Sequence, residues 1–233
     1  MRFLRKLLLF IILIVIIVCG LFFYGGYDLY KKTIKDNPVS EKIETIQDKV
    51  NYVSIDDVPD YYIKAVVAVE DRRFYDHKTI DVIAITRAIV SNIRQKDFKE
   101  GGSTLTQQTA KNMYFMTEKD AVSRKIAELL VGIDLEKNYS KDEILEIYIN
   151  TIYFGDGYYG IKEACKGYLN KSPSDITLSE ATMLAGVPNA PSVYAPTKNI
   201  ELTQSRQKKV ISTMVECGYL SQEEADEIEL YSK

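Results

Sequence analysis

The sequence predicts a mainly α-helical protein with one membrane-spanning helix at its N-terminus. Three observations support this prediction: a long uncharged apolar run near the start, repeated helix-start signals after it, and no stretch that alternates apolar and polar residues for long enough to indicate a sheet. A chain of 233 residues with a net charge of −3 suits one folded domain plus an appendage.

The apolar run has the length and the flanking charges of a membrane anchor. It extends from Leu7 to Tyr24 without a charged residue, close to the roughly 20 residues that a spanning helix needs. Arg2, Arg5 and Lys6 precede it, so the N-terminus is predicted to be cytoplasmic and the rest of the chain extracytoplasmic. A cleaved signal peptide is the alternative, but its apolar region is shorter and ends at a small-x-small site, which this run lacks.

These features divide the chain into four expected parts. They are a cytoplasmic tail (1–6), a transmembrane anchor (7–25), a polar and partly helical stalk (26–56) and an extracytoplasmic folded domain (57–233). In the stalk, Ile43, Ile46 and Val50 recur at helical spacing.

Helix-start signals mark the folded domain. Pro59 lies where a first helical turn is expected, a position at which its missing N–H costs little. A serine or threonine followed three residues later by glutamate predicts a capping box at three places: Ser140–Glu143, Thr177–Glu180 and Ser221–Glu224. Turn residues gather in 154–160 and 187–196, where helical segments are expected to end.

The composition excludes several functional classes. There is no basic excess, so nucleic acid is not an expected partner. Three scattered cysteines do not indicate a disulfide framework or a zinc site, and Cys165 and Cys217 are predicted to be buried thiols. His77 is the only histidine, so a mechanism with several imidazoles is excluded. A lone histidine is more typical of a structural hydrogen bond than of catalysis or metal binding.

Glu70 is the first candidate for chemistry. Ile63, Val66 and Val67 lead to it by helical spacing, so its carboxylate falls on the stripe that should face inward. Burial raises the pKa of a carboxylate towards the value that suits a general base. The alternative is a helix end at which one of the arginines that follow pairs with Glu70. The spacing alone leaves both interpretations open.

The stretch GGSTLTQQTAKN, residues 101–112, combines two glycines with short polar side chains. Thr104 and Gln107 have capping-box spacing, so a helix is predicted to start here. The free N–H groups and positive dipole end of such a start also suit phosphate oxygens, and Lys111 lies on the same side as Gln107. The stretch therefore predicts a helix start that can serve as an anion site.

A second carboxylate, Glu128, lies four residues after Arg124. A pair at this spacing is ordinarily a surface salt bridge that contributes a few tenths of a kcal/mol. The functional alternative has Arg124 contact a substrate phosphate while Glu128 orients it or binds a metal. The expected core stripe of this segment is Ile126, Leu129, Leu130 and Ile133.

Five stretches together resemble the motifs of the family 51 peptidoglycan glycosyltransferases. In chain order they are EDRRFYDH, GGSTLTQQTAKN, RKIAE, KDEILEIYINTIYFG and LSEATMLAGVPNAPSVYAP. The resemblance covers residues 50–215, and five motifs in register are highly specific. No Ser-x-x-Lys, Ser-x-Asn and Lys-Thr-Gly set follows in a second domain. We therefore expect the monofunctional type of transglycosylase.

The resemblance implies a lysozyme-like, two-lobed helical domain with a groove between the lobes. The expected substrate is lipid II, a disaccharide-pentapeptide on undecaprenyl pyrophosphate. Its 4-hydroxyl attacks the anomeric carbon of the lipid-linked growing glycan with inversion, and undecaprenyl pyrophosphate leaves. The expected partners are lipid II, the nascent glycan, the cytoplasmic membrane and other cell-wall synthases.

The resemblance also implies roles for single residues. Glu70 matches the general base, and Glu128 matches a second essential carboxylate associated with the pyrophosphate and often with a divalent cation, Mg²⁺ or Mn²⁺; no organic cofactor is implied. The residues that would support Glu70 are Asp71, Phe74 and His77. Those that would contact the pyrophosphate and sugars are Ser103, Thr104, Gln107, Gln108, Lys111, Lys119 and Arg124. One departure is Thr79, at a position where the family usually has glycine.

The residue types favour transfer over hydrolysis. A glycosidase expels an alkoxide and needs a carboxyl group held neutral as a general acid, whereas a pyrophosphate leaves as a stable anion and needs positive charge. Around Glu128 the sequence places Lys111, Lys119, Arg124 and Lys125. The alternatives are a membrane-tethered muramidase or lytic transglycosylase that cleaves glycan strands, and a non-catalytic lipid-binding scaffold.

Overall fold

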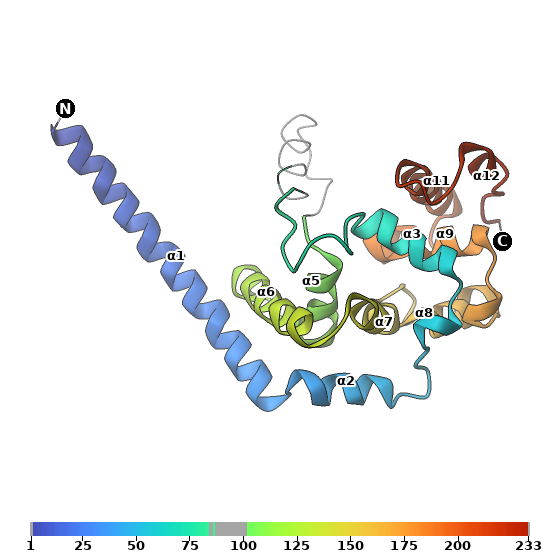
Figure 1. Ribbon diagram of the computed structural model, residues 1–233, viewed down its shortest axis with the longest axis horizontal. Helices are drawn as coiled ribbons and strands as arrows, with labels where there is room; N and C mark the ends of the chain where they lie inside the picture. Colours follow the sequence, from blue (N-terminus) through green and yellow to red (C-terminus); the bar gives the residue numbers. More distant parts are fainter. Residues whose placement is uncertain (1, 84–85, 87–101, 233) are drawn as a thin grey trace.

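Helices form almost all of the regular structure (Figure 1). The computed structural model describes residues 2–83, 86 and 102–232. In these residues there is no β-strand, and only an isolated bridge joins Tyr153 to Tyr159. The predicted mainly α class is therefore confirmed.

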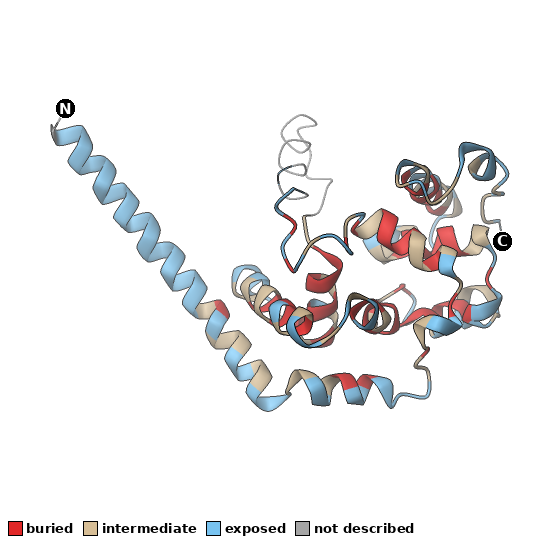
Figure 2. Cartoon of the chain, viewed as in Figure 1, coloured by how far each residue is buried: buried red, intermediate tan, exposed pale blue. Residues whose placement is uncertain are grey.

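A single long helix, α1 (Arg2–Asp36), contains the predicted anchor. Most of its length is exposed (Figure 2). The large apolar residues between Leu7 and Tyr24 are all exposed. Among the described residues, it is the one helix long and apolar enough to cross a membrane, with a mean hydropathy of 3.3 over its most apolar window. An apolar surface of this extent suits contact with lipid rather than with water.

The last turns of α1 pack against α6 (Ala121–Asn138). A Cβ atom on Gly26 would lie 2.4 Å from Cβ of Ile126, so the two helices approach closely at this glycine. The Tyr30 hydroxyl donates a hydrogen bond to Asp134 Oδ2 at 2.6 Å along the same contact. The chain from residue 26 to 36, predicted as part of a stalk, thus continues the anchor helix and docks it onto the domain.

The rest of the expected stalk also packs on the domain. α2 (Val39–Gln47) contacts α7 (Lys141–Thr151). Ile43 and Ile46 are buried, as their spacing predicts, but Val50 is 96% exposed. The inclusion of Val50 in this helical pattern was wrong, because α2 ends before reaching it.

The folded domain consists of two groups of helices (Figure 1). In one group, α3 (Asp60–Glu70), α9 (Leu178–Gly186) and α11 (Ile200–Glu216) pack on one another. In the other, α5 (Leu105–Ala110) packs on α6 and α7. The shorter helices are η1 (Ile55–Asp57), η2 (Lys111–Phe115), α8 (Ile161–Ala164), η3 (Cys165–Leu169), η4 (Pro173–Asp175), η5 (Val187–Asn189), α10 (Pro191–Tyr194) and α12 (Gln222–Asp226).

Local sequence signals determine several helix starts. All three predicted capping boxes are present, before α7, α9 and α12. α3 begins at Asp60 with Pro59 as its N-cap, so the proline lies just before the first turn rather than within it. Of the predicted buried thiols, Cys165 is buried and Cys217 is half-buried.

The predicted core stripe of α6 was wrong. Its buried residues are Ala127, Glu128, Val131, Gly132 and Leu135. Ile133 is 47% exposed, whereas Ile126, Leu129 and Leu130 are half-buried. The reason is that both α1 and α5 pack on α6, so the inward face carries Ala127, Val131 and Leu135 instead of the predicted stripe.

Gly26→Leu should weaken the docking of α1 on α6, because the new side chain would overlap Ile126. Overpacking of this kind typically costs about 1–3 kcal/mol. We expect a lower Tm for the detergent-solubilised protein. Gly20→Leu is the matched control, since nothing lies within 4 Å of a Cβ at that position. Equal Tm values for the two variants would contradict the contact.

Candidate active site

Glu70 is the last residue of α3 and its side chain is only 10% exposed. Its Oε2 accepts a hydrogen bond from Gln108 Nε2 at 2.9 Å. Its Oε1 is buried, and no described residue donates a hydrogen bond to it. Burial raises the pKa of Glu70, while the Gln108 amide and the nearby charge of Arg206 act in the opposite direction. A carboxylate in this setting is suited to accept a proton.

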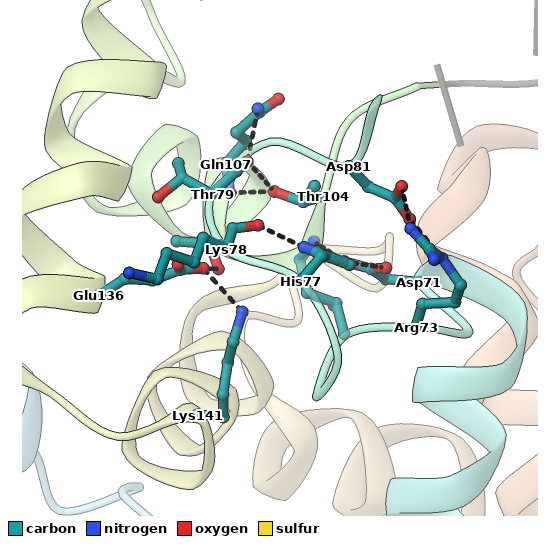
Figure 3. A network of polar contacts seen from close by, with 12 residues as sticks. Asp71, Arg73, His77, Lys78, Thr79, Asp81, Thr104, Gln107, Glu136 and Lys141 are labelled. Atoms are coloured by element: carbon teal, nitrogen blue, oxygen red, sulfur yellow. Dashed lines mark hydrogen bonds and ion pairs between the residues drawn. The ribbon is translucent and has the colours of Figure 1, made fainter. Parts of the chain in front are cut away.

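Neither of the arginines that follow Glu70 pairs with it, so that alternative was wrong. Arg72 Nη1 lies 3.1 Å from Glu216 Oε2. Arg73 donates through Nε to Asp81 Oδ2 at 3.1 Å (Figure 3). The cation that faces Glu70 comes instead from α11, whose Arg206 was not singled out by any pattern in the sequence.

Asp71 joins the end of α3 to the start of α5. His77 Nε2 donates to Asp71 Oδ1 at 2.7 Å, and both side chains are nearly fully buried. The backbone N–H of Leu105 donates to Asp71 Oδ2 at 3.0 Å. Both carboxylate oxygens are therefore occupied, and the loop that carries His77 is tied to the first residue of α5.

Thr79 stands where the resemblance implied a glycine. The described non-glycine residues with positive φ are Asp156 and Asn170, so the backbone at Thr79 does not need glycine. Its carbonyl accepts hydrogen bonds from Thr104 Oγ1 at 3.0 Å and from Gln107 Nε2 at 2.9 Å (Figure 3). The turn is thus held in place by the start of α5.

Thr104 and Gln107 are buried, and their described hydrogen bonds are internal to the protein. Thr104 is the N-cap of α5, because its Oγ1 accepts from the backbone N–H of Gln107 at 3.2 Å. The predicted helix start is therefore present at the predicted residue. Contact of these two side chains with a substrate stays a prediction, and Gly101 of the same stretch lies outside the described residues.

Glu128 lies in a cationic cluster at the start of α6, with its side chain 3% exposed. Lys125 Nζ is 3.0 Å from Oε2, and Arg124 Nε is 3.3 Å from Oε1. Lys125 Nζ also donates to Ser103 Oγ at 2.6 Å, and Arg124 Nη1 donates to the Glu118 carbonyl at 3.0 Å. Because Glu128 is buried, its pair with Arg124 is not an ordinary surface salt bridge.

The α5 segment connects the two carboxylates. Ser103, just before this helix, contacts Lys125 beside Glu128, and Gln108 within it donates to Glu70. The first three stretches of the resemblance, distant in sequence, therefore meet through one short helix.

Three other expected site residues make no contact with Glu70 or Glu128 among the described interactions: two lysines lie on the surface and one phenylalanine lies in the core. Lys111 and Lys119 are exposed, and neither has an ion pair or a side-chain hydrogen bond among the described residues. Phe74 is fully buried in the core, and Lys141 Nζ lies 4.4 Å from the centre of its ring. The two lysines are thus accessible to an anion, whereas Phe74 supports the site by packing.

The fourth stretch of the resemblance positions α3. Asn150 Oδ1 accepts from the backbone N–H of Val53 at 2.9 Å, and its Nδ2 donates to the Val53 carbonyl at 2.8 Å. Glu146 accepts from the backbone N–H of Ile55 at 2.8 Å. These side chains of α7 hold the chain that leads into α3, and so contribute indirectly to the placement of Glu70.

The residues around Glu128 do not form a cation site by themselves. Both carboxylate oxygens already face a cationic side chain. Among the described residues, the one group with three potential ligand atoms within 4.8 Å of one another is Asp71, His77 and Asp81. There the protein's own donors, including Arg73, already bind the carboxylates. The expected divalent cation therefore stays a prediction, and no step proposed below uses a metal.

The sequence matches a known protein family and is similar to several known proteins. The model of the transglycosylase family matches residues 37–215. The chain is 38% identical over 214 residues to penicillin-binding protein 1F of Bacillus subtilis, covering 88% of this chain and 30% of that protein. It is 43% identical over 176 residues to penicillin-binding protein 1A of Neisseria flavescens, covering 76% and 22%. A crystal structure of penicillin-binding protein 1A from Haemophilus influenzae is similar with a TM-score of 0.45 and 25% identity, over 78% of this chain and 18% of that one. The chain thus spans less than a third of the length of these relatives.

The methyl group of Thr79 and Gly132 on α6 should be energetically coupled. A Cβ atom on Gly132 would lie 2.6 Å from Thr79 Cγ2. In Gly132→Ala, this overlap costs about 1–3 kcal/mol and is partly offset by a helix-propensity gain of about 1 kcal/mol. Thr79→Ser removes the methyl group, so the double variant should recover most of the overlap cost. Denaturant unfolding of the wild type, the two single variants and the double variant gives the coupling free energy between the two positions. A coupling free energy near zero would exclude the contact.

Proposed function

The chain belongs to the transglycosylase family, the family 51 peptidoglycan glycosyltransferases, and on this premise we propose that it polymerises lipid II at a membrane surface. It transfers the lipid-linked growing glycan to the 4-hydroxyl of lipid II with inversion, and undecaprenyl pyrophosphate is released. The observation that carries the proposal is the link through α5 between Glu70 at one end and the cationic Glu128 cluster at the other.

In this reaction Glu70 is the general base. Gln108 fixes one carboxylate oxygen, and the other has no hydrogen-bond donor among the described residues. The carboxylate takes the proton of the acceptor hydroxyl as the acceptor oxygen bonds to the anomeric carbon of the donor. The bond between that carbon and the phosphate oxygen breaks, and its electron pair leaves with the pyrophosphate. Attack from the face opposite the leaving group inverts the configuration.

The cluster around Glu128 is suited to the departing pyrophosphate. Lys125 and Arg124 together outweigh the single negative charge of Glu128. Lys111 and Lys119 add exposed positive charge. A leaving group stabilised by such charges does not need a proton, so the reaction requires no second carboxyl group held neutral. This chemistry supports transfer rather than hydrolysis.

The anchor supports the same proposal. The apolar α1 helix is of a length to cross the membrane once, and it docks onto α6, which carries the Glu128 cluster. We place the N-terminus in the cytoplasm because Arg2, Arg5 and Lys6 precede the apolar run. The domain then meets its lipid-linked substrate at the outer surface of the membrane, where other cell-wall synthases are proposed partners.

The direct test is to incubate the detergent-solubilised protein with labelled lipid II. Glycan ladders and release of undecaprenyl pyrophosphate are the expected result. In a parallel reaction the protein receives isolated, lipid-free glycan strands, which it should leave intact. Shortened strands would support a muramidase or lytic transglycosylase instead, and binding of lipid II without ladders would support a scaffold.

Glu70→Gln should abolish most polymerisation without unfolding the protein. The amide keeps the size of the carboxylate but cannot take a proton, and loss of a general base typically lowers the rate by about 10²–10⁴-fold. The rate of ladder formation and the Tm measure the two effects. Glu216→Gln is the control, because Glu216 is exposed and pairs with Arg72 rather than contacting Glu70. Near wild-type activity of Glu70→Gln would remove Glu70 as the base.

Lys111→Ala should weaken the apparent affinity for lipid II several-fold with little change in Tm. Lys111 is exposed and makes no ion pair with a described residue, so its removal costs charge but not packing. The effect should shrink as ionic strength rises, because salt screens exposed charges. Lys137→Ala, also exposed but near the far end of α6, should leave the affinity unchanged. Equal affinities of the two variants at low salt would contradict a role for Lys111 in binding.

A further inference from the structure

Arg206 is the cation that faces the buried oxygen of Glu70. Its Nη2 lies 3.9 Å from Glu70 Oε1, and the two side chains are 15% and 10% exposed. This separation is too long for a hydrogen bond but suits attraction between charges that solvent screens only weakly. The second oxygen of Glu70 meets the neutral amide of Gln108.

We propose that Arg206 is a positioning residue that keeps Glu70 ionised and ready to accept a proton. The proposal rests on the function proposed above, in which Glu70 is the general base. It also gives a role to the fifth stretch of the resemblance, residues 178–196, which contacts Arg206 but contains none of the predicted site residues.

Two residues of that stretch hold the Arg206 side chain. Its Nε donates to the carbonyl of Gly186, the last residue of α9, at 3.3 Å. Its guanidinium lies over the ring of Tyr194, the last residue of α10, 5.8 Å from the ring centre. The side chain also passes Gly186 closely, since a Cβ there would lie 2.9 Å from Arg206 Cγ.

These contacts hold the guanidinium without neutralising its charge. A carbonyl and an aromatic ring attract a cation but carry no net negative charge. Among the described residues, Glu70 is the one carboxylate within 4.0 Å of Arg206. The positive charge therefore acts on the carboxylate that the reaction uses.

The other groups that face Glu70 do not supply positive charge. Asp71, the next residue, disfavours a second negative charge nearby. Tyr62 on α3 and Tyr148 on α7 are buried, and burial keeps the pKa of both hydroxyls well above the usual value, so both are neutral. α5 contributes Gln108, and the buried residues of α9 are uncharged. The Gln108 amide and the Arg206 charge thus both offset the burial of an ionised Glu70, and Arg206 is the one of the two that carries a positive charge.

The test is the pH dependence of kcat/KM for lipid II polymerisation by the full-length protein. Glu70 must be ionised to act as a base, so the rate falls as pH drops through its pKa. Arg206→Gln removes the positive charge and should raise this pKa, which moves the acid limb of the profile upward by about one pH unit. At a fixed pH on that limb the rate falls about tenfold, and it recovers at higher pH.

Three further variants separate charge from structure. Arg206→Lys keeps the charge without the planar fork and should shift the limb less. Gly186→Ala displaces the Arg206 side chain and should shift the limb in the same direction as Arg206→Gln, by a smaller amount. Tyr194→Phe keeps the aromatic ring and should leave the profile where it is. Thermal unfolding shows which variants fold. If Arg206→Gln does not fold, the shift of the acid limb is measured with Gly186→Ala instead.

Each outcome is decisive. If the wild-type protein forms ladders and folded Arg206→Gln shows either an unshifted limb or a loss that is equal at every pH, Arg206 is merely structural and the inference fails while the proposed function stands. If the wild-type protein forms no ladders at any pH, the proposed function fails, and the inference fails with it.

Discussion

The arrangement of the site depends on the buried carboxylate of Asp71. A buried charge is tolerated only when donors satisfy it, and Asp71 has two, the His77 ring and the Leu105 backbone. By binding both, it sets the end of α3 against the start of α5. Gln108 then reaches Glu70, and the residue just before α5 reaches the cationic cluster on α6.

The two glutamates of the site have contrasting surroundings although their side chains are identical. Glu70 meets one neutral donor and one cation at a distance, whereas Glu128 is in direct contact with two cations. The first setting favours proton transfer, because the negative charge is only partly compensated. The second favours a stable ion cluster that an anionic group can join. Environment rather than residue type thus separates the two proposed roles.

Local signals in the sequence predicted much of the fold, because capping boxes and helical spacing depend on residues a few positions apart. The three capping boxes, the N-cap at Thr104 and the inward face of Glu70 are of this kind. Contacts between distant helices were not predictable. The stripe of α6 was wrong because α1 and α5 both pack on it, and Arg206 resembles any other basic residue of a helix until α9 and α10 surround it.

The continuous α1 helix has a further mechanical consequence. At about 1.5 Å per residue, its 35 residues extend for roughly 50 Å, more than the hydrocarbon layer of about 30 Å. The turns from Gly26 onward pack on α6, so the folded domain is attached directly to the end of the membrane-spanning part of a stiff helix. A flexible tether would let the domain tumble above the bilayer, but a rod sets both its height and the direction it faces. One residue added to the helix before Gly26 would lengthen it by about 1.5 Å, so the length of the anchor sets how far the domain stands from the bilayer.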